Sequence, residues 1–179
     1  MKNKELLNKV EKKKLILRSC SERGDKKILF IDRNLLINFE GVHCFRSQDF
    51  TPNQDLIKHI SSSKFADWEK ILIHHAKEVT LSWQTLDQLK NIDIKLNNYL
   101  DEWDFRLIDQ INCIHDENIE GNEALSVSCS CHPLKGGMFL DSSVKHKLSL
   151  SKCYYMFEKE NYAEVAKRFD ITTLTNKDL

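Results

Sequence analysis

Three cysteines and one histidine form two short pairs in the second half of the chain. One residue separates Cys113 from His115, and one residue separates Cys129 from Cys131. Three thiolates and one imidazole suit tetrahedral Zn²⁺, and four protein ligands leave no open position for water. Binding of such an ion would order the polar stretch 116–128 between the two pairs. We therefore expect a structural zinc site, with buried free thiols as the alternative interpretation.

A second candidate for chemistry is Asp32, which follows the apolar run 27–31. Such a run is typical of a buried parallel strand, and open α/β sheets bind ligands at the carboxyl ends of their strands. A carboxylate at that position can attack phosphorus or bind Mg²⁺. An aspartate at a strand end is also a common cap or turn residue, so this position alone does not define a site.

The elements that would position these residues alternate along the chain. Short apolar runs predict strands over 27–32, 70–73, 107–111, 154–156 and 171–174. Helical spacing of apolar residues predicts helices over 56–60, 83–100 and 163–169. Ser82 is the expected N-cap of the second helix, and 113–137 is expected to be a polar loop. The alternation predicts an α/β fold with a mainly parallel sheet flanked by helices.

Length and charge exclude several classes of protein. The 179 residues fit one domain, and Lys+Arg and Asp+Glu both count 27. This balance provides no general attraction to nucleic acid or to an anionic membrane. The apolar runs are far shorter than the roughly 20 residues that cross a bilayer, and the first residues lack the apolar core of a secretory signal. We expect a cytoplasmic protein with reduced thiols, without membrane or nucleic-acid partners.

The first residues differ in composition from the rest. Residues 1–25 are rich in Lys, Arg and Glu, with apolar residues at roughly helical spacing and a break at Gly24. We expect an N-terminal helical extension over 1–25 and one α/β domain over 26–179. The apolar face of the extension would pack on this domain or on a partner.

The residues around Asp32 resemble the first motif of the haloacid dehalogenase (HAD) superfamily phosphatases. The branch of heptose-bisphosphate and histidinol-phosphate phosphatases typically reads Phe-Leu-Asp-Arg-Asp-Gly-Thr-Leu-Ile, and 30–37 reads Phe-Ile-Asp-Arg-Asn-Leu-Leu-Ile. That branch also carries a Cys-x-His and Cys-x-Cys zinc loop ending in Gly-Met, like Gly137 and Met138 here. The resemblance covers the chain from about residue 26 onward. It implies a Rossmann-like HAD fold with a minimal cap and a zinc loop.

The resemblance implies a two-step phosphoryl transfer, for which several positions are altered here. Asp32 keeps the nucleophile position, but Asn34 stands at the acid/base position, and its amide cannot exchange a proton at neutral pH. His74 stands at a phosphate-binding position. Pro133 replaces the phosphate-binding lysine, with Lys135 as a candidate substitute two residues further on.

The magnesium position is altered in a similar way. The candidate Mg²⁺ ligands are Asp32, Asn34 and Glu158, and Glu158 is one methylene longer than the family's aspartate. Phe157 replaces a glycine of the last family motif, and Tyr162 replaces its second carboxylate. These changes disfavour magnesium as a cofactor, whereas all four zinc positions are present.

These changes predict a pseudophosphatase, which keeps the fold and acts by binding an unidentified protein or a small phosphorylated ligand, as a monomer. The alternative is an active Mg²⁺-dependent phosphatase on a small metabolite, such as a sugar phosphate or histidinol phosphate. A nucleic-acid-end phosphatase is disfavoured by the zero net charge. A pocket filled by Leu36, Phe157 and Tyr162 would favour the first reading, and an open pocket at Asp32 would favour the alternative.

Overall fold

The computed structural model describes residues 26–41 and 43–179. The predicted N-terminal helix over 1–25 lies outside the described residues. Within the described part of the chain, no helix is both long enough and apolar enough to cross a bilayer.

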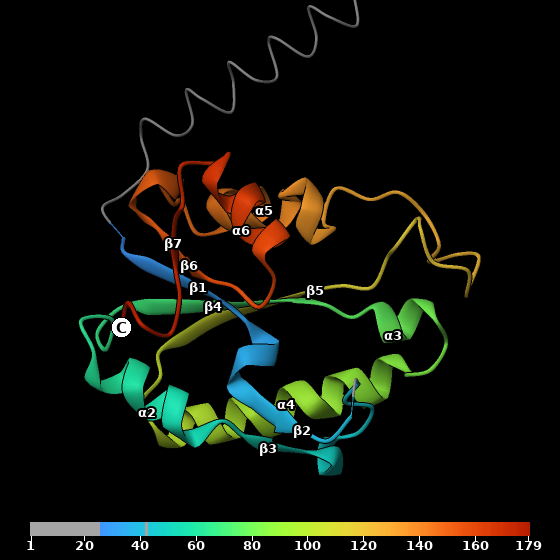
Figure 1. Cartoon of the computed structure of the whole chain (residues 1–179), viewed down its shortest axis with the longest axis horizontal. Coiled ribbons are helices and arrows are strands. Elements are labelled where there is room, and N and C mark those ends of the chain that lie inside the picture. Colours follow the sequence, from blue (N-terminus) through green and yellow to red (C-terminus); the bar gives the residue numbers. More distant parts are fainter. Residues whose placement is uncertain (1–25, 42) are drawn as a thin grey trace, which may run out of the picture.

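A five-stranded parallel sheet runs through the middle of the molecule in the order β5-β4-β1-β6-β7 (Figure 1). Its strands are β1 (Ile28–Asp32), β4 (Glu69–His75), β5 (Leu107–Cys113), β6 (Tyr154–Met156) and β7 (Thr172–Leu174). All five residues of β1 are buried, because helices cover both faces of the sheet. The predicted α/β fold is confirmed.

Helices flank the sheet on both sides (Figure 1). One face carries α2 (Gln54–Ser62) and α4 (Leu86–Glu102), and the other carries α5 (Gly137–Lys145) and α6 (Glu160–Lys167). Successive residues of β1 point to opposite faces, so Leu29 packs in the cluster with α2 and α4, and Phe30 packs in the cluster with α5 and α6. The sheet therefore has two separate apolar cores, which together hold the strand ends rigidly in place.

Short elements connect these layers. A small antiparallel hairpin pairs β2 (Ile37–Phe39) with β3 (Phe50–Pro52), and α3 (Lys77–Thr80) follows β4. The remaining elements are 3₁₀ helices: η1 (Arg33–Leu36), η2 (Ser47–Asp49), η3 (Pro133–Lys135) and η4 (Leu150–Lys152). The hairpin, α3 and α5 were not among the predicted elements. The hairpin strands and α3 are too short to show a period, and most apolar residues of α5 are consecutive rather than helically spaced.

The start of α4 corrects one prediction. Its N-cap is Thr85, whose hydroxyl accepts the backbone N–H of Gln88 while the Gln88 side chain accepts the N–H of Thr85. Ser82 has a φ of +58° and belongs to the preceding turn. This reciprocal capping box satisfies two helix donors at once, which a lone serine at position 82 cannot do.

Candidate functional site

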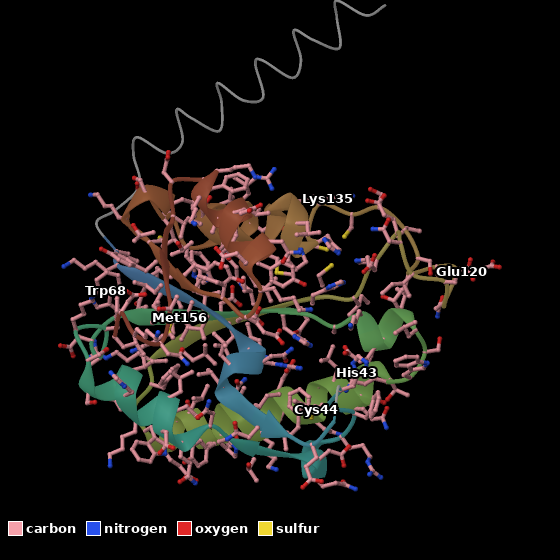
Figure 2. All side chains as sticks on the ribbon, viewed as in Figure 1. His43, Cys44, Trp68, Glu120, Lys135 and Met156 are labelled. Atoms are coloured by element: carbon pink, nitrogen blue, oxygen red, sulfur yellow. The ribbon has the colours of Figure 1, made fainter. Side chains whose placement is uncertain are left out.

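The four predicted metal ligands lie together at the carboxyl end of β5. Cys113 is the last residue of that strand, and His115 follows it. Cys129 and Cys131 come from the returning arm of the loop, and Figure 2 shows sulfur atoms gathered beside the segment that carries Lys135. The donor atoms of all four ligands lie within 4.8 Å of one another.

The separations inside this cysteine cluster fit one tetrahedral ion. The Cys131 Sγ lies 3.2 Å from the Sγ of Cys113, 3.3 Å from the Sγ of Cys129 and 3.6 Å from Nδ1 of His115. Tetrahedral ligands with Zn–S bonds of about 2.3 Å stand about 3.8 Å apart, so small shifts of the sulfur atoms would accommodate zinc. Burial raises the pKa of the Cys113 thiol, so a bound cation would be needed to keep it ionised.

Backbone contacts hold the loop that carries the cluster. The N–H of Gly137 donates to the carbonyl of Ser130, between the two cysteines of the second arm. A Cβ at position 137 would lie 2.0 Å from that carbonyl oxygen, so only glycine permits this approach. On the other arm, the Thr80 hydroxyl donates to the carbonyl of Ile114 over 2.6 Å. The helix α5 and the segment after β4 thus fix the two arms separately.

A second site is a cavity of about 180 Å³ at the carboxyl ends of β1, β4 and β6. Its lining residues are Asp32, Asn34, Phe39, His74, His75, Lys77, Glu78, Glu158, Lys159 and Tyr162. Leu36 and Phe157 are not among them: Leu36 packs in the core with α2, and Phe157 packs on the opposite core. The three bulky residues therefore do not fill the site, and only Tyr162 forms part of its wall.

Three carboxylate residues line this cavity: Glu78 pairs with His43, whereas Asp32 and Glu158 influence each other. Burial and the nearby charge of Glu158 raise the pKa of Asp32 to about 7, against the opposing effect of hydrogen bonds from the backbone of Asn34 and Glu158. The amide Nδ2 of Asn34 donates to Oε2 of Glu158 over 3.2 Å. A cation between Asp32 and Glu158 would relieve their repulsion, so these residues fit a divalent ion such as Mg²⁺.

Arg33 forms a buried ion pair with Asp93 and also contacts His74, which stays neutral. Nη2 of Arg33 lies 2.8 Å from Nε2 of His74, while Nη1 of Arg33 donates to Oδ1 of Asp93 over 3.0 Å. A guanidinium only donates, so Nε2 accepts and the proton is on Nδ1. Burial, followed by the charge of Arg33, lowers the pKa of His74 well below its usual value of 6.5. His74 therefore supplies no positive charge for a phosphate group.

The structure does not bring Lys135 to the Asp32 cavity. Its Nζ donates to Oε1 of Glu117 and to Oγ of Ser128, each over 2.6 Å, at the outer side of the cysteine loop. Two other lysines, Lys77 and Lys159, are among the residues that line the cavity, and sequence reasoning missed both. Both follow closely after a sheet strand, so the rule that ligands bind at carboxyl strand ends was the signal that could have found them.

Comparison with known proteins extends the description of the fold. No family model matches the chain. It is 22% identical over 136 residues to a D-glycero-beta-D-manno-heptose-1,7-bisphosphate 7-phosphatase from Helicobacter pylori strain J99, which covers 75% of this chain and 74% of the relative.

Two solved structures are similar in fold. A D,D-heptose 1,7-bisphosphate phosphatase from B. bronchiseptica, complexed with magnesium and phosphate, has a TM-score of 0.70 at 14% identity, over 83% of this chain and 78% of that one. A protein from Mesorhizobium loti described as a HAD-like phosphatase has a TM-score of 0.71 at 15% identity, over 82% and 69%. The chain therefore has the fold of the HAD-like phosphatases, and in sequence and structure it resembles their heptose-bisphosphate phosphatase branch.

Proposed function

We propose that this protein is a Mg²⁺-dependent phosphatase that acts on a small phosphorylated metabolite, with Asp32 as the nucleophile. The observation that carries this proposal is the cavity that Asp32 lines together with a second carboxylate residue, Glu158, and two lysines, Lys77 and Lys159. Paired carboxylates are suited to Mg²⁺, and ammonium groups are suited to phosphoryl oxygens. The cysteine cluster is proposed to hold a structural zinc ion.

The chain's own residues provide the parts for a two-step transfer. Lys77 and Lys159 would hold the phosphoryl oxygens, and the ionised Asp32 would attack phosphorus and displace the alkoxide, which takes a proton from solvent water. Water then attacks the phosphorus of the aspartyl phosphate, which releases phosphate and restores the carboxylate. Bound Mg²⁺, held by Asp32 and Glu158, would offset the negative charge that gathers in the cavity. A phosphoryl transfer of this kind depends mainly on positioning and charge.

The site lacks a side chain suited to protonating the leaving group. Asn34 cannot donate a proton, and His74 is turned toward Arg33 and kept neutral. A missing general acid typically costs about 10²–10⁴-fold in rate. We therefore expect slow turnover, and binding without turnover is the second candidate function that the amide of Asn34 favours.

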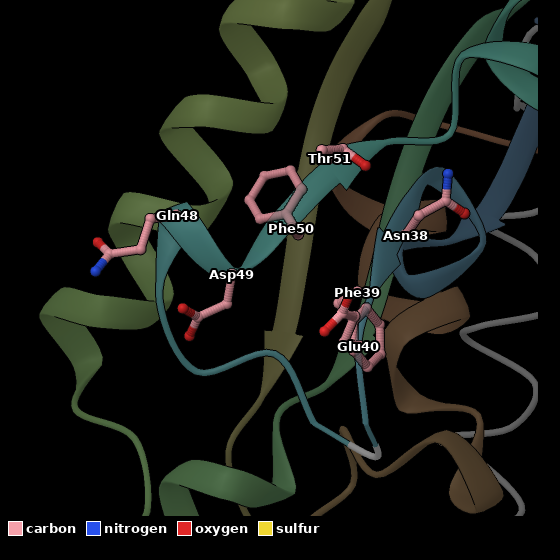
Figure 3. A pocket seen from close by; sticks show the side chains of 7 residues that line it. All are labelled: Asn38, Phe39, Glu40, Gln48, Asp49, Phe50 and Thr51. Atoms are coloured by element: carbon pink, nitrogen blue, oxygen red, sulfur yellow. The ribbon is translucent and has the colours of Figure 1, made fainter.

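A neighbouring groove offers space for the rest of the substrate. The residues that line it belong to the β2–β3 hairpin and to η2, and Phe39 lines both this groove and the Asp32 cavity (Figure 3). Glu40 and Asp49 provide carboxylate oxygens there, and Asp49 is paired with Arg46. Carboxylates accept hydrogen bonds from hydroxyl groups, so a polyol or sugar phosphate suits the groove better than a second phosphate group does.

The decisive experiment measures phosphate release from a panel of sugar phosphates and histidinol phosphate with Mg²⁺. We expect slow release by the wild type, and none by Asp32→Asn or by the wild type when Mg²⁺ is left out of the assay. Asn34→Asp should raise the rate by about tenfold or more, because it supplies the missing acid and the neighbouring charge of Glu158 would raise the pKa of the new carboxyl group. Ligand binding with no release of phosphate by the wild type would replace this proposal by the second candidate.

A further inference from the structure

We propose that His75, Asp116 and His132 bind a second divalent transition-metal ion, separate from the ion of the cysteine cluster. These three residues form a group of metal-binding side chains whose donor atoms lie within 4.8 Å of one another. None of them is a ligand of the cysteine cluster, and the proposed function does not use them as ligands. Two imidazoles and one carboxylate are a common donor set for Zn²⁺ and Fe²⁺.

The distances fit an ion better than direct hydrogen bonds. Oδ2 of Asp116 lies 3.6 Å from Nε2 of His75 and 3.6 Å from Nε2 of His132. These separations exceed hydrogen-bonding distance. Ligands with bonds of about 2.0–2.1 Å around one tetrahedral ion stand about 3.4 Å apart, close to the observed values. The two imidazole rings are 4.4 Å apart at 68°, so both nitrogens can approach a common point.

The second group is adjacent to the cysteine cluster in the sequence. Asp116 directly follows the ligand His115, and His132 directly follows the ligand Cys131. Each arm of the cysteine loop therefore contributes adjacent residues to the two groups, and His75 at the end of β4 completes the second group.

The three side chains of this group are mostly buried. The side chains of His75, Asp116 and His132 are only 8%, 11% and 11% exposed. Nε2 of His75 is also 3.3 Å from the carbonyl of His115, and the N–H of Leu134 donates to Nδ1 of His132 over 3.2 Å. An ion bound through both Nε2 atoms moves the ring protons to Nδ1, so these two contacts are lost. Two neutral hydrogen bonds contribute little compared with the binding of a divalent ion.

Three protein ligands make this site different in kind from the cysteine cluster. Such a site keeps at least one position open for water or for an oxygen of a ligand, whereas four protein ligands close the shell. His75 also lines the Asp32 cavity, so one residue of the proposed site belongs to the wall of that cavity.

The test is the metal content of the full-length protein, loaded with Zn²⁺ or Co²⁺ and then dialysed. We expect about two ions per chain, and about one in both His75→Gln and Asp116→Asn. His146→Gln is the matched control, because His146 pairs with Asp109 at a different place and should leave the content at two. In the cobalt form, the thiolate-to-cobalt absorption should stay at full intensity in His75→Gln, which also reports that the cysteine loop is folded.

Other outcomes would overturn the inference. One ion per chain in the wild type, or two ions in both His75→Gln and Asp116→Asn, would show that these residues hold no metal. A thiolate absorption that disappears together with the second ion would show one mixed site instead. None of these readouts depends on phosphate release, so failure here is distinguishable from failure of the proposed function.

Discussion

The cysteine cluster and the Asp32 cavity lie near the same edge of the sheet but are built in different ways. The cluster uses two arms of one loop, and its ligands are close in sequence from Cys113 to Cys131. The cavity joins the ends of strands that are far apart in the chain, from Asp32 to Glu158. All four ligand positions of the cysteine motif are present, whereas among the positions that resemble the catalytic motifs Asp32 is kept and several others have changed.

This difference shows which forces each region depends on. The loop has few apolar side chains, so we expect its order to depend on a bound metal and on contacts such as Gly137 to Ser130. The cavity lies at the ends of β1, β4 and β6, whose residues are mostly buried, so we expect that its polar residues can change without loss of the fold. Next to the cavity, Arg33 contacts His74 and forms an ion pair with Asp93, and we expect this pair to stabilise the cavity as a metal would stabilise the loop.

The strongest test of this comparison removes one ligand of the cluster. Cys129→Ser should lose the bound metal and lower the free energy of unfolding by on the order of 4 kcal/mol, the value for a ligand present at 1,000 times its Kd. Elemental analysis and thermal unfolding measure both effects. Ser130→Ala is the matched control, because Ser130 lies between the two cysteines with an exposed side chain. Equal metal content and stability in the two variants would show that the loop does not depend on metal.

The corresponding test beside the Asp32 cavity is Asp93→Asn, which removes the charged partner of Arg33. It leaves the Arg33 guanidinium, whose side chain is 2% exposed, without a charged partner. Breaking a buried ion pair on one side costs about 3 kcal/mol or more, which denaturant unfolding can measure. Asp101→Asn on the exposed side of the same helix should change stability by less than about 0.5 kcal/mol. A small effect of Asp93→Asn would mean that the cavity does not rest on this ion pair.

Gly137→Ala tests whether the two regions are independent. The new methyl group would meet the backbone of Ser130, so the second arm must move. We expect a loss of about 2 kcal/mol in stability, as in other overpacked sites, together with weaker metal retention. Phosphate release, measured under metal-saturating conditions, should change little. A loss of activity as large as the loss of metal would show that the cluster positions the cavity as well.

The smallest expected effect is a dependence of stability on pH through His74. The unfolded chain binds a proton at His74 as the pH falls below 6.5, but the folded chain does not, because burial keeps that pKa low. The unfolded state thus binds more protons, and stability falls with falling pH. His74→Gln keeps an acceptor for Arg33 but cannot titrate.

The measurement is the difference in unfolding free energy between His74→Gln and the wild type. This difference should grow by about 1 kcal/mol between pH 6.5 and about pH 5.5. Taking the difference cancels the pH dependence of metal binding, which both proteins share. A difference that stays constant over this interval would mean that His74 is protonated in the folded chain.

The sequence by itself determined the order of strands and helices, the place of Asp32 at a strand end, and the four residues of the cysteine cluster. These features are local. A few neighbouring positions are enough to recognise an apolar run, a helical period or two ligands separated by one residue. Short elements such as α3 and the β2–β3 hairpin escaped because they contain too few residues for a period, and the start of α4 depended on a reciprocal cap.

Only the tertiary structure decided which charges face Asp32. Lys135 is close to the cysteines in sequence but bonds Glu117 and Ser128, whereas Lys159 reaches the cavity from the end of another strand. Likewise, the state of His74 depends on Arg33, 41 residues earlier in the chain. Such contacts arise from how the sheet brings distant strand ends together, and the energy of a charge depends on its burial and its neighbours, which no local pattern records.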